Sequence, residues 1–203
     1  MTSVSDVVQA PARRLRVLRR PQATTGFWSW FTTIDHKKIG IMYGTTALAF
    51  LVIGGIEALL LRLQLAGPNG SLLTAAQYNE LFTMHGTGMI FFFATPLVVG
   101  LANYFTPLHL GAADVVFPRL NAFGFWLSLA GALTAFAGFL TAGGAAAFGW
   151  TAYPPLSSSA FSPGSGADLW IIGVALTGTG SILAAVNLIA TIFGMRAPTA
   201  SRK

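Results

Sequence analysis

FTMHGTGMIFFFATPLVVGLANYF, residues 82–105, is the stretch that decides the fold of this chain. It has no Asp, Glu, Lys or Arg and is long enough to cross a bilayer core of about 30 Å, which takes roughly 20 residues of helix. Of the 203 residues, 54% are hydrophobic and 9% are charged. Soluble domains carry about 25% charged residues, so this composition predicts a membrane protein.

Three further segments share this character, and together they predict four transmembrane helices at about 39–61, 82–105, 120–140 and 169–195. Apolar segments without alternation must pair their backbone groups internally inside a bilayer, which only a helix allows. No small-residue cleavage motif follows the first segment, so it is a retained span and not a signal peptide. The predicted fold class is an all-α, polytopic membrane helix bundle.

Charge predicts how the bundle lies in the membrane. Eleven of the twelve Lys and Arg residues fall on one side of four spans, and only Arg62 falls on the other. By the positive-inside rule, the amino terminus, the 107–119 loop and the carboxyl terminus face the cytoplasm of a multi-pass plasma-membrane protein. We expect residues 1–26 to be a basic, mobile arm near anionic lipid headgroups, with no nucleic acid as partner. Cysteine is absent, which excludes disulfides and thiolate metal sites.

His85 lies one turn into the second span. An imidazole in a membrane helix is costly unless it is paired or bound, and neutral imidazole ligates haem iron. Gly86 and Gly88 would leave an open flank for a flat macrocycle. The alternative is a histidine that bonds a neighbouring helix, with the glycines as packing positions. This helix alone leaves both interpretations open.

A second group of polar residues could hold a file of waters that conducts protons. It combines a carboxylate in the 107–119 loop with amides and hydroxyls within or beside the spans: Asn103, Asp114, Asn121, Thr177, Ser181 and Asn187. The alternative is a solvated loop carboxylate with polar groups that hold helices together, and spacing alone favours it.

Three residues near the outer ends of spans have interfacial alternatives. Arg62 is either a snorkelling cation or a fixed donor to the polar edge of a cofactor. Trp150 and Tyr153 fit the aromatic belt of a membrane interface. Glu57, in the first span, is unusual for a position facing lipid and is expected to be paired in the interior or protonated.

Five ordered motifs carry a family resemblance: DHKKIGIMY (35–43), LFTMHGTGMIFFFATP (81–96), ANYFTPLHLGAADVVFPRLNAFGFW (102–126), FGWTAYPPLS (148–157) and NLIATIFGMRAP (187–198). Together they resemble haem–copper oxidase subunit I, especially the aa3-type cytochrome c oxidases of actinobacteria. The likeness covers nearly all of residues 27–198, which we interpret as the membrane region. It implies the first third of a twelve-helix subunit.

The resemblance implies roles for the residues around the second span. His85 matches an axial ligand of the low-spin haem a, and Arg62 matches the arginine that bonds the formyl group of this haem. Trp150 and Tyr153 match the segment near the haem propionates.

For the second group, the resemblance implies the lower part of the D proton pathway. Asp114 matches the carboxylate at the mouth of that pathway. Asn103 and Asn121 match the asparagines just inside it, and Ser181 and Asn187 match polar residues higher in the channel.

The implied enzyme is cytochrome c oxidase, in complex with other oxidase subunits in the lipid bilayer. It would take electrons from cytochrome c, reduce oxygen to water at a haem a3–copper centre and pump protons. Gln77 stands where quinol-oxidising relatives often carry His, which favours cytochrome c as donor. Gly124 and Gly180 replace serines common in the family, so the water chain is thinner or rerouted. Gln64 replaces a Glu that helps many relatives to form a calcium or sodium site, which argues against that site here.

The resemblance ends at residue 198, and we expect residues 199–203, TASRK, to be a non-family tail. In relatives, the second haem a ligand and the ligands of copper and haem a3 belong to later helices. We therefore expect the 203 residues to be inactive alone, as a fragment, a truncation or one half of a split subunit. The alternative is a non-catalytic membrane remnant or packing partner, and the DNA downstream of Lys203 would separate the two.

Overall fold

The computed structural model describes residues 26–195, so the predicted basic arm, apart from its last residue, and the tail at 199–203 lie outside it. The chain forms two units, one up to Thr33 and the other from Ile34 onward. In the first unit, the short helix α2 (Trp28–Phe31) carries a cluster of exposed aromatic rings, in which Phe27 and Phe31 meet edge to face at 5.1 Å.

The second unit contains the predicted membrane bundle. Four helical segments are long and apolar enough to span a bilayer, and no strand occurs in residues 26–195. They are α3 (His36–Gln64), the continuous run α4 (Ala75–Thr87), η2 (Gly88–Ala94) and α5 (Thr95–Leu110), then α6 (Pro118–Phe136) with η3 (Ala137–Leu140), and α7 (Ser165–Gly194). The all-α fold and the four spans are therefore confirmed.

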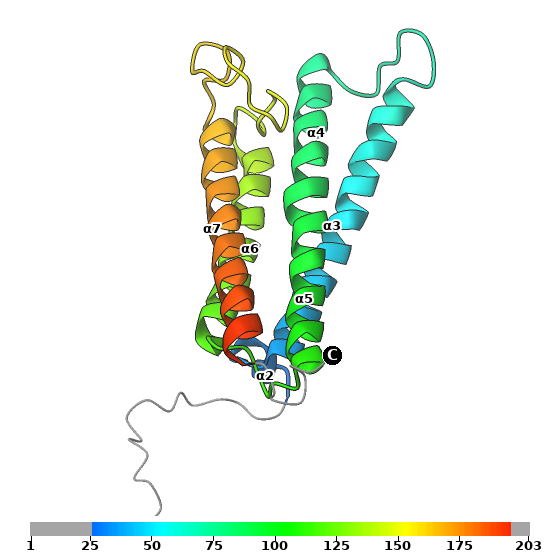
Figure 1. Cartoon of the computed structure of the whole chain (residues 1–203). Helices are drawn as coiled ribbons and strands as arrows, with labels where there is room; N and C mark the ends of the chain where they lie inside the picture. The colour runs from blue at the N-terminus through cyan, green and yellow to red at the C-terminus, as the bar shows by residue number, and fades with distance from the viewer. Residues whose placement is uncertain (1–25, 196–203) are drawn as a thin grey trace, which may run out of the picture. The chain divides into compact units, whose positions relative to one another are not determined.

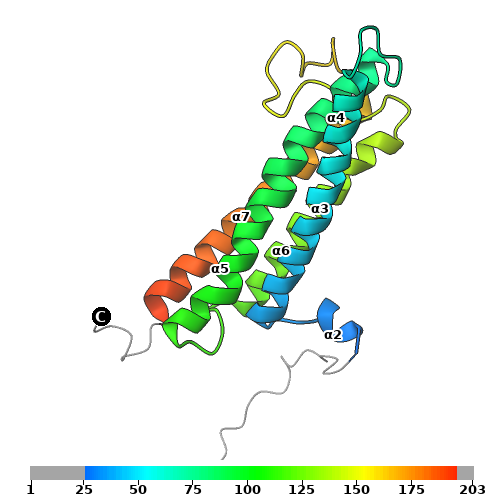
Figure 2. The same ribbon diagram turned by 90° about the vertical axis from the view of Figure 1, so that its right-hand side faces the viewer.

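The loops divide the bundle into two ends (Figure 1). Loops 65–74 and 141–164 lie at one end, called here the His85 end, and loop 111–117 lies at the other, the Asp114 end. Figure 2 shows the second span running from α4 into α5 without a break.

The spans extend beyond the segments predicted from hydropathy because polar residues cap them. Asp35 accepts a hydrogen bond from the backbone N–H of Lys37 at 2.9 Å and starts α3. Thr74 and Gln77 form a reciprocal capping box that starts α4 well before Phe82. Hydropathy misses these first turns because they are polar.

A π-helix interrupts the second span just before Pro96. It covers η2, and the Thr95 hydroxyl donates to the carbonyl of Ile90 at 2.9 Å. Proline has no N–H for the helical ladder, and a wider turn is a common way to accommodate this in a membrane helix. The disturbance that a proline brings to a helix takes the form of a π-helical segment here.

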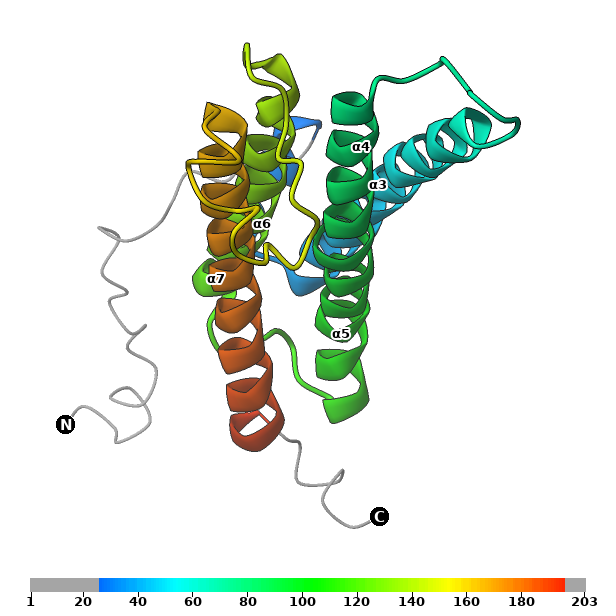
Figure 3. The ribbon, with the colours of Figure 1, turned by 90° about the horizontal axis from the view of Figure 1, so that it is seen from above.

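Glycines allow the helices to pack in two close pairs, visible from above in Figure 3. A Cβ atom built on Gly173 of α7 would lie 2.6 Å from the Gly131 carbonyl oxygen of α6. A Cβ on Gly40 of α3 would likewise lie 2.8 Å from the Gly100 oxygen of α5. Small residues at such crossings are typical of membrane helices, because they let backbones approach. From its crossing, α3 diverges from α4 toward the His85 end (Figures 1 and 3).

Aromatic side chains fill the space between the two pairs. Phe50 of α3, Phe92 of η2 and Phe136 of α6 meet with ring centroids 5.4–6.0 Å apart. This apolar centre separates the polar groups of the two ends.

Candidate cofactor site and polar channel

His85 is held by a hydrogen bond to a neighbouring helix. Its Nδ1 lies 2.9 Å from the carbonyl oxygen of Gly54 in α3. Because a carbonyl oxygen only accepts, Nδ1 carries the proton and Nε2 keeps its lone pair. A histidine whose Nδ1–H is fixed by a backbone carbonyl is the usual arrangement for an imidazole that ligates a metal through Nε2. The structure thus shows the bond to a neighbouring helix, whereas the haem-ligand interpretation of His85 stays a prediction with which this geometry is compatible.

The sequence predicts an open flank beside His85 at Gly86 and Gly88, but the structure fills it at Gly86. A Cβ on Gly86 would lie 2.9 Å from Cδ1 of Trp150, so the Trp150 indole fills the flank that was expected to be open. At Gly88 the nearest atom to an added Cβ would be Cζ of Phe136 at 3.9 Å, which leaves room there. Trp150 also meets Phe91 with centroids 6.2 Å apart. The fold therefore brings Trp150 and the His85 helix together.

Arg62 and Tyr153 lie at the same end, and among the described residues neither forms a hydrogen bond with His85. Arg62 is exposed in the last turn of α3, and Tyr153 is 69% exposed in loop 141–164. In the described part of the chain, no three His, Asp or Glu side chains gather into a metal site. This end therefore carries one imidazole fixed by a neighbouring helix, with the Trp150 indole packed against Gly86 beside it.

At the end of α3, both polar atoms of the Gln64 side-chain amide form hydrogen bonds. Its Nε2 donates to the Gly70 carbonyl at 2.6 Å, and its Oε1 accepts from the Leu73 N–H at 2.7 Å. The side chain therefore pins loop 65–74 through hydrogen bonds.

At the Asp114 end, Asp114 pairs with a buried histidine. Its Oδ1 lies 3.1 Å from Nδ1 of His36, which is only 1% exposed. Nε2 of His36 is buried and has no hydrogen-bond partner among residues 26–195. His36 precedes the first apolar segment, so the predicted topology put it at the cytoplasmic surface. This is wrong as to burial, because the Asp35 cap puts His36 in the first turn of α3, where it is buried.

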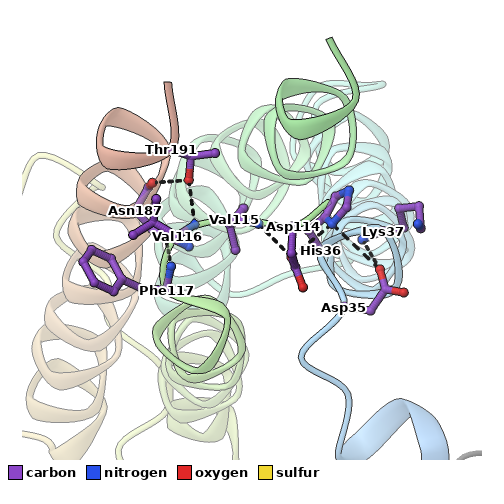
Figure 4. A network of polar contacts seen from close by, with 9 residues as sticks. All are labelled: Asp35, His36, Lys37, Asp114, Val115, Val116, Phe117, Asn187 and Thr191. Atoms are coloured by element: carbon purple, nitrogen blue, oxygen red, sulfur yellow. Dashed lines mark hydrogen bonds and ion pairs between the residues drawn. The ribbon is translucent and has the colours of Figure 1, made fainter. Parts of the chain in front are cut away.

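Two side chains of α7 hold the loop that carries Asp114. Asn187 Oδ1 accepts from the backbone N–H of Phe117 at 2.9 Å, and Thr191 Oγ1 accepts from that of Val116 at 3.1 Å (Figure 4). Asp114 Oδ1 itself accepts from the N–H of Val115 at 2.8 Å. Asn187 thus has a structural role in addition to the one predicted, and Thr191 was not singled out.

Buried amides face the interior behind this loop. Asn103 of α5 is 0% exposed and Asn121 of α6 is 1% exposed. In the part of the chain that the structure describes, neither amide has a partner for its nitrogen or its oxygen. Nδ2 of Asn187 is also without one. Buried polar atoms are nearly always hydrogen-bonded, and buried waters commonly bond those that lack a protein partner. Three helices thus each carry a buried amide with at least one polar atom that lacks a partner among the described residues.

Ser181 lies apart from this set. It is half-buried, and its hydroxyl donates to the Thr177 carbonyl of its own helix at 3.1 Å. The fully buried polar residues of α7 are Thr177, Asn187 and Thr191. Sequence reasoning also passed over Tyr43 and Ser128, whose hydroxyls are buried in α3 and α6. Tyr43 lies two helical turns after His36, and Ser128 lies two turns after Asn121. This spacing puts each pair on one face of its helix and could have indicated both hydroxyls.

Known proteins resemble this chain over most of its length. Residues 38–203 match the family described as cytochrome C and quinol oxidase polypeptide I. A relative from Nocardia farcinica, described as "probable cytochrome c oxidase subunit 1-beta", is 60% identical over 82% of the chain and 28% of its own length.

Two relatives described as cytochrome c oxidase subunit 1 are each 54% identical to the chain. The one from Corynebacterium efficiens matches over 84% of the chain and 30% of its own length. The one from Corynebacterium diphtheriae matches over 98% and 36%. The chain thus spans about a third of the length of the curated relatives it matches.

Proposed function

The chain belongs to the cytochrome C and quinol oxidase polypeptide I family, and on this basis we propose that it acts as the amino-terminal part of a cytochrome c oxidase subunit I. In that role it contributes one axial ligand to a low-spin haem a and the lower D pathway of a proton-pumping oxidase that reduces oxygen to water. We also propose that this chain works together with a haem a3–copper centre, with cytochrome c as electron donor and with other oxidase subunits. So does the orientation that puts the Asp114 end in the cytoplasm.

The fixed tautomer of His85 supports the haem part of this proposal. Nε2 of His85 would bind the iron, Arg62 would donate to the formyl group, and Trp150 and Tyr153 would lie near the propionates. Bound haem supplies a group that accepts and passes on one electron at a time. The protein's contribution is to hold the imidazole with Nδ1 on the Gly54 carbonyl, which keeps Nε2 free to coordinate.

The Asp114–His36 pair is the observation that carries the proton part of the proposal. Asp114 is partly exposed, so its carboxylate can take protons from water. His36 lies beside it and can accept a proton at Nδ1 while releasing one from Nε2, because an imidazole has a titratable nitrogen on each side. Nε2 is buried in the bundle, as are the amides of Asn103 and Asn121, which would orient waters for the next transfers.

The test is Asp114→Asn in an assembled oxidase that carries this segment. The change keeps the shape and removes the titratable group, so turnover and proton pumping should fall at least about tenfold, since positioned proton-transfer groups contribute about 10²–10⁴. The haem spectrum should stay normal, because His85 lies at the opposite end of the bundle. Asp168→Asn, at an exposed position in the first turn of α7, is the matched control and should have no effect.

Normal turnover and pumping in Asp114→Asn would contradict the proposal and leave Asp114 as a solvated surface charge. A disturbed haem spectrum in that variant would also contradict it, because the damage would then be structural.

A further inference from the structure

Two threonines flank His85 in the chain, one two residues before it and one two residues after it. Thr83 and Thr87 are both 0% exposed. In an α-helix each residue is turned by about 100° from the previous one, so these threonines lie about 40° apart on one face of α4. His85 projects from the opposite face, about 160° from each of them. The helix therefore presents the imidazole to one side and the two hydroxyls to the other.

Each of these hydroxyls accepts a hydrogen bond from a group outside α4. The backbone N–H of Gly149, in loop 141–164, donates to Oγ1 of Thr83 at 2.8 Å. The indole Nε1–H of Trp170, in α7, donates to Oγ1 of Thr87 at 2.8 Å. A backbone N–H and an indole N–H can only donate, so each position on α4 has to supply an acceptor.

The two hydroxyls are fixed in direction because each of them also donates. Oγ1 of Thr83 donates to the Asn79 carbonyl, and Oγ1 of Thr87 donates to the Thr83 carbonyl, both at 2.8 Å. A hydroxyl has one proton to donate, and these bonds use it within α4. The lone pairs are left for the two outside donors, and neither side chain can turn without losing bonds on both sides.

The outside partners are themselves held in place. Trp170 is 7% exposed, and its ring meets that of Phe148 edge to face with centroids 5.1 Å apart. Gly149 has a φ of +80°, in the left-handed region that favours glycine. It is followed by Trp150, whose indole packs against α4. The bond to Thr83 therefore also ties down the loop that brings this indole to the helix.

The helix α4 lies between α3 and α7 (Figures 1 and 3), so it is held from two opposite sides. On the α3 side, Nδ1 of His85 lies 2.9 Å from the Gly54 carbonyl oxygen. The end of a side chain lies about 5 Å from the helix axis, so a rotation of α4 by about 20° would move it by about 2 Å. A displacement of that size weakens or breaks this bond, because hydrogen bonds depend steeply on distance and angle.

We propose that Thr83 and Thr87 act as positioning residues for His85. Their bonds to the loop and to α7 fix the rotation of α4 about its axis, and this keeps Nδ1 of the imidazole on the Gly54 carbonyl with Nε2 free. An effect on bound haem rests on the proposed function, whereas the orientation of the imidazole can be measured on the chain itself.

The orientation is tested on the full chain in lipid nanodiscs, with its three histidines labelled with ¹⁵N. The signals that His85→Ala removes belong to His85, and NMR shows which of its ring nitrogens carries the proton. The wild type should show one form, protonated at Nδ1. Thr83→Val and Thr87→Val keep the shape without the hydroxyl and should each give a mixture of the two tautomers.

Two control variants should keep the wild-type His85 signal. Thr87→Ser retains the hydroxyl and should therefore retain the bond from the indole. Thr134→Val removes a hydroxyl that bonds the Ala130 carbonyl of its own helix, α6. Val variants at 83 and 87 that also show the wild-type signal would overturn the inference.

A double variant separates positioning from stability. Thr87→Val leaves the buried indole N–H of Trp170 without its acceptor, which should lower the melting temperature. Thr87→Val/Trp170→Phe removes both partners, a replacement that can be nearly neutral, so the melting temperature should rise again. The anchor of α4 is still missing, so the mixture of His85 tautomers should persist. A wild-type His85 signal in the double variant would overturn the inference, because the threonine would then serve stability alone.

The consequence for haem is tested in an assembled oxidase that carries this segment. Thr83→Val and Thr87→Val should shift the electron paramagnetic resonance signal and the midpoint potential of the low-spin haem, because the groups that orient a ligand tune its metal. If His85→Ala abolishes the low-spin signal while both Val variants leave signal and potential unchanged, the proposed function stands and this inference fails. If the low-spin signal survives His85→Ala, the haem part of the proposed function fails, and the tautomer measurement alone decides the inference.

Discussion

Replacing Asn187 by Leu should loosen the loop that carries Asp114. Leu has the same branched shape as Asn but cannot accept the hydrogen bond that the Phe117 N–H donates at 2.9 Å. Leaving a partly buried N–H unpaired costs about 1–3 kcal/mol. Since about 1.4 kcal/mol is a factor of ten, the amide of Phe117 should exchange with deuterium about 5- to 150-fold faster.

The assay is amide hydrogen exchange of residues 111–120 in the reconstituted chain, followed by mass spectrometry or NMR. Thr191→Val should act in the same way on Val116, whose N–H it leaves without the Thr191 hydroxyl. Thr179→Val is the matched control, because the Thr179 hydroxyl bonds only the Ala175 carbonyl of its own helix. Unchanged exchange in Asn187→Leu and Thr191→Val would refute the reasoning that α7 holds this loop.

Three further predictions concern the bundle itself. Gly173→Leu should push α6 and α7 apart and lower the melting temperature, because overpacking costs about 1–3 kcal/mol or more. Gly178→Leu is the control and should not lower it, since the space around its Cβ position is open. Equal melting temperatures for the two variants would contradict the packing described. Glu57 is buried in a span, with 5% of its surface exposed. Glu57→Gln should keep the stability of the chain and Glu57→Lys should lower it, because a charge inside a bilayer is costly. Equal yields of the two folded variants would argue against this. Gln64→Ala should make loop 65–74 more sensitive to limited proteolysis, since it removes both hydrogen bonds of the amide, and an unchanged cleavage rate would show that the loop is held in another way.

The spans could be predicted because lipid imposes one simple requirement. A helix long and apolar enough to cross the bilayer is visible as composition alone, as in residues 82–105. The true ends of the helices were missed where polar caps extend them, as at Asp35 and Thr74. The π-helix before Pro96 was also not predicted, because a proline indicates a disturbance but not the form it takes.

The sequence indicated candidate residues one by one, but it did not indicate the contacts between them. His85 and Asp114 were identified from their type and position. The Gly54 carbonyl that fixes His85 lies on another helix, and no local pattern points to it. His36 was missed because its span end was assigned to the surface, although its first-turn position faces inward. Ser128 was not singled out because its neighbour Gly180 comes from another helix, which the sequence around Ser128 does not indicate.

The most direct test of the account is the optical spectrum of an oxidase complex purified through a tag on this chain. With the wild-type chain, the reduced complex should show the band of a low-spin haem a. His85→Ala should remove that band, since Nε2 of His85 would bind the iron, whereas His109→Ala, at an exposed position in the last turn of α5, should leave it intact. A low-spin band that survives His85→Ala, or a complex without haem, would contradict the account.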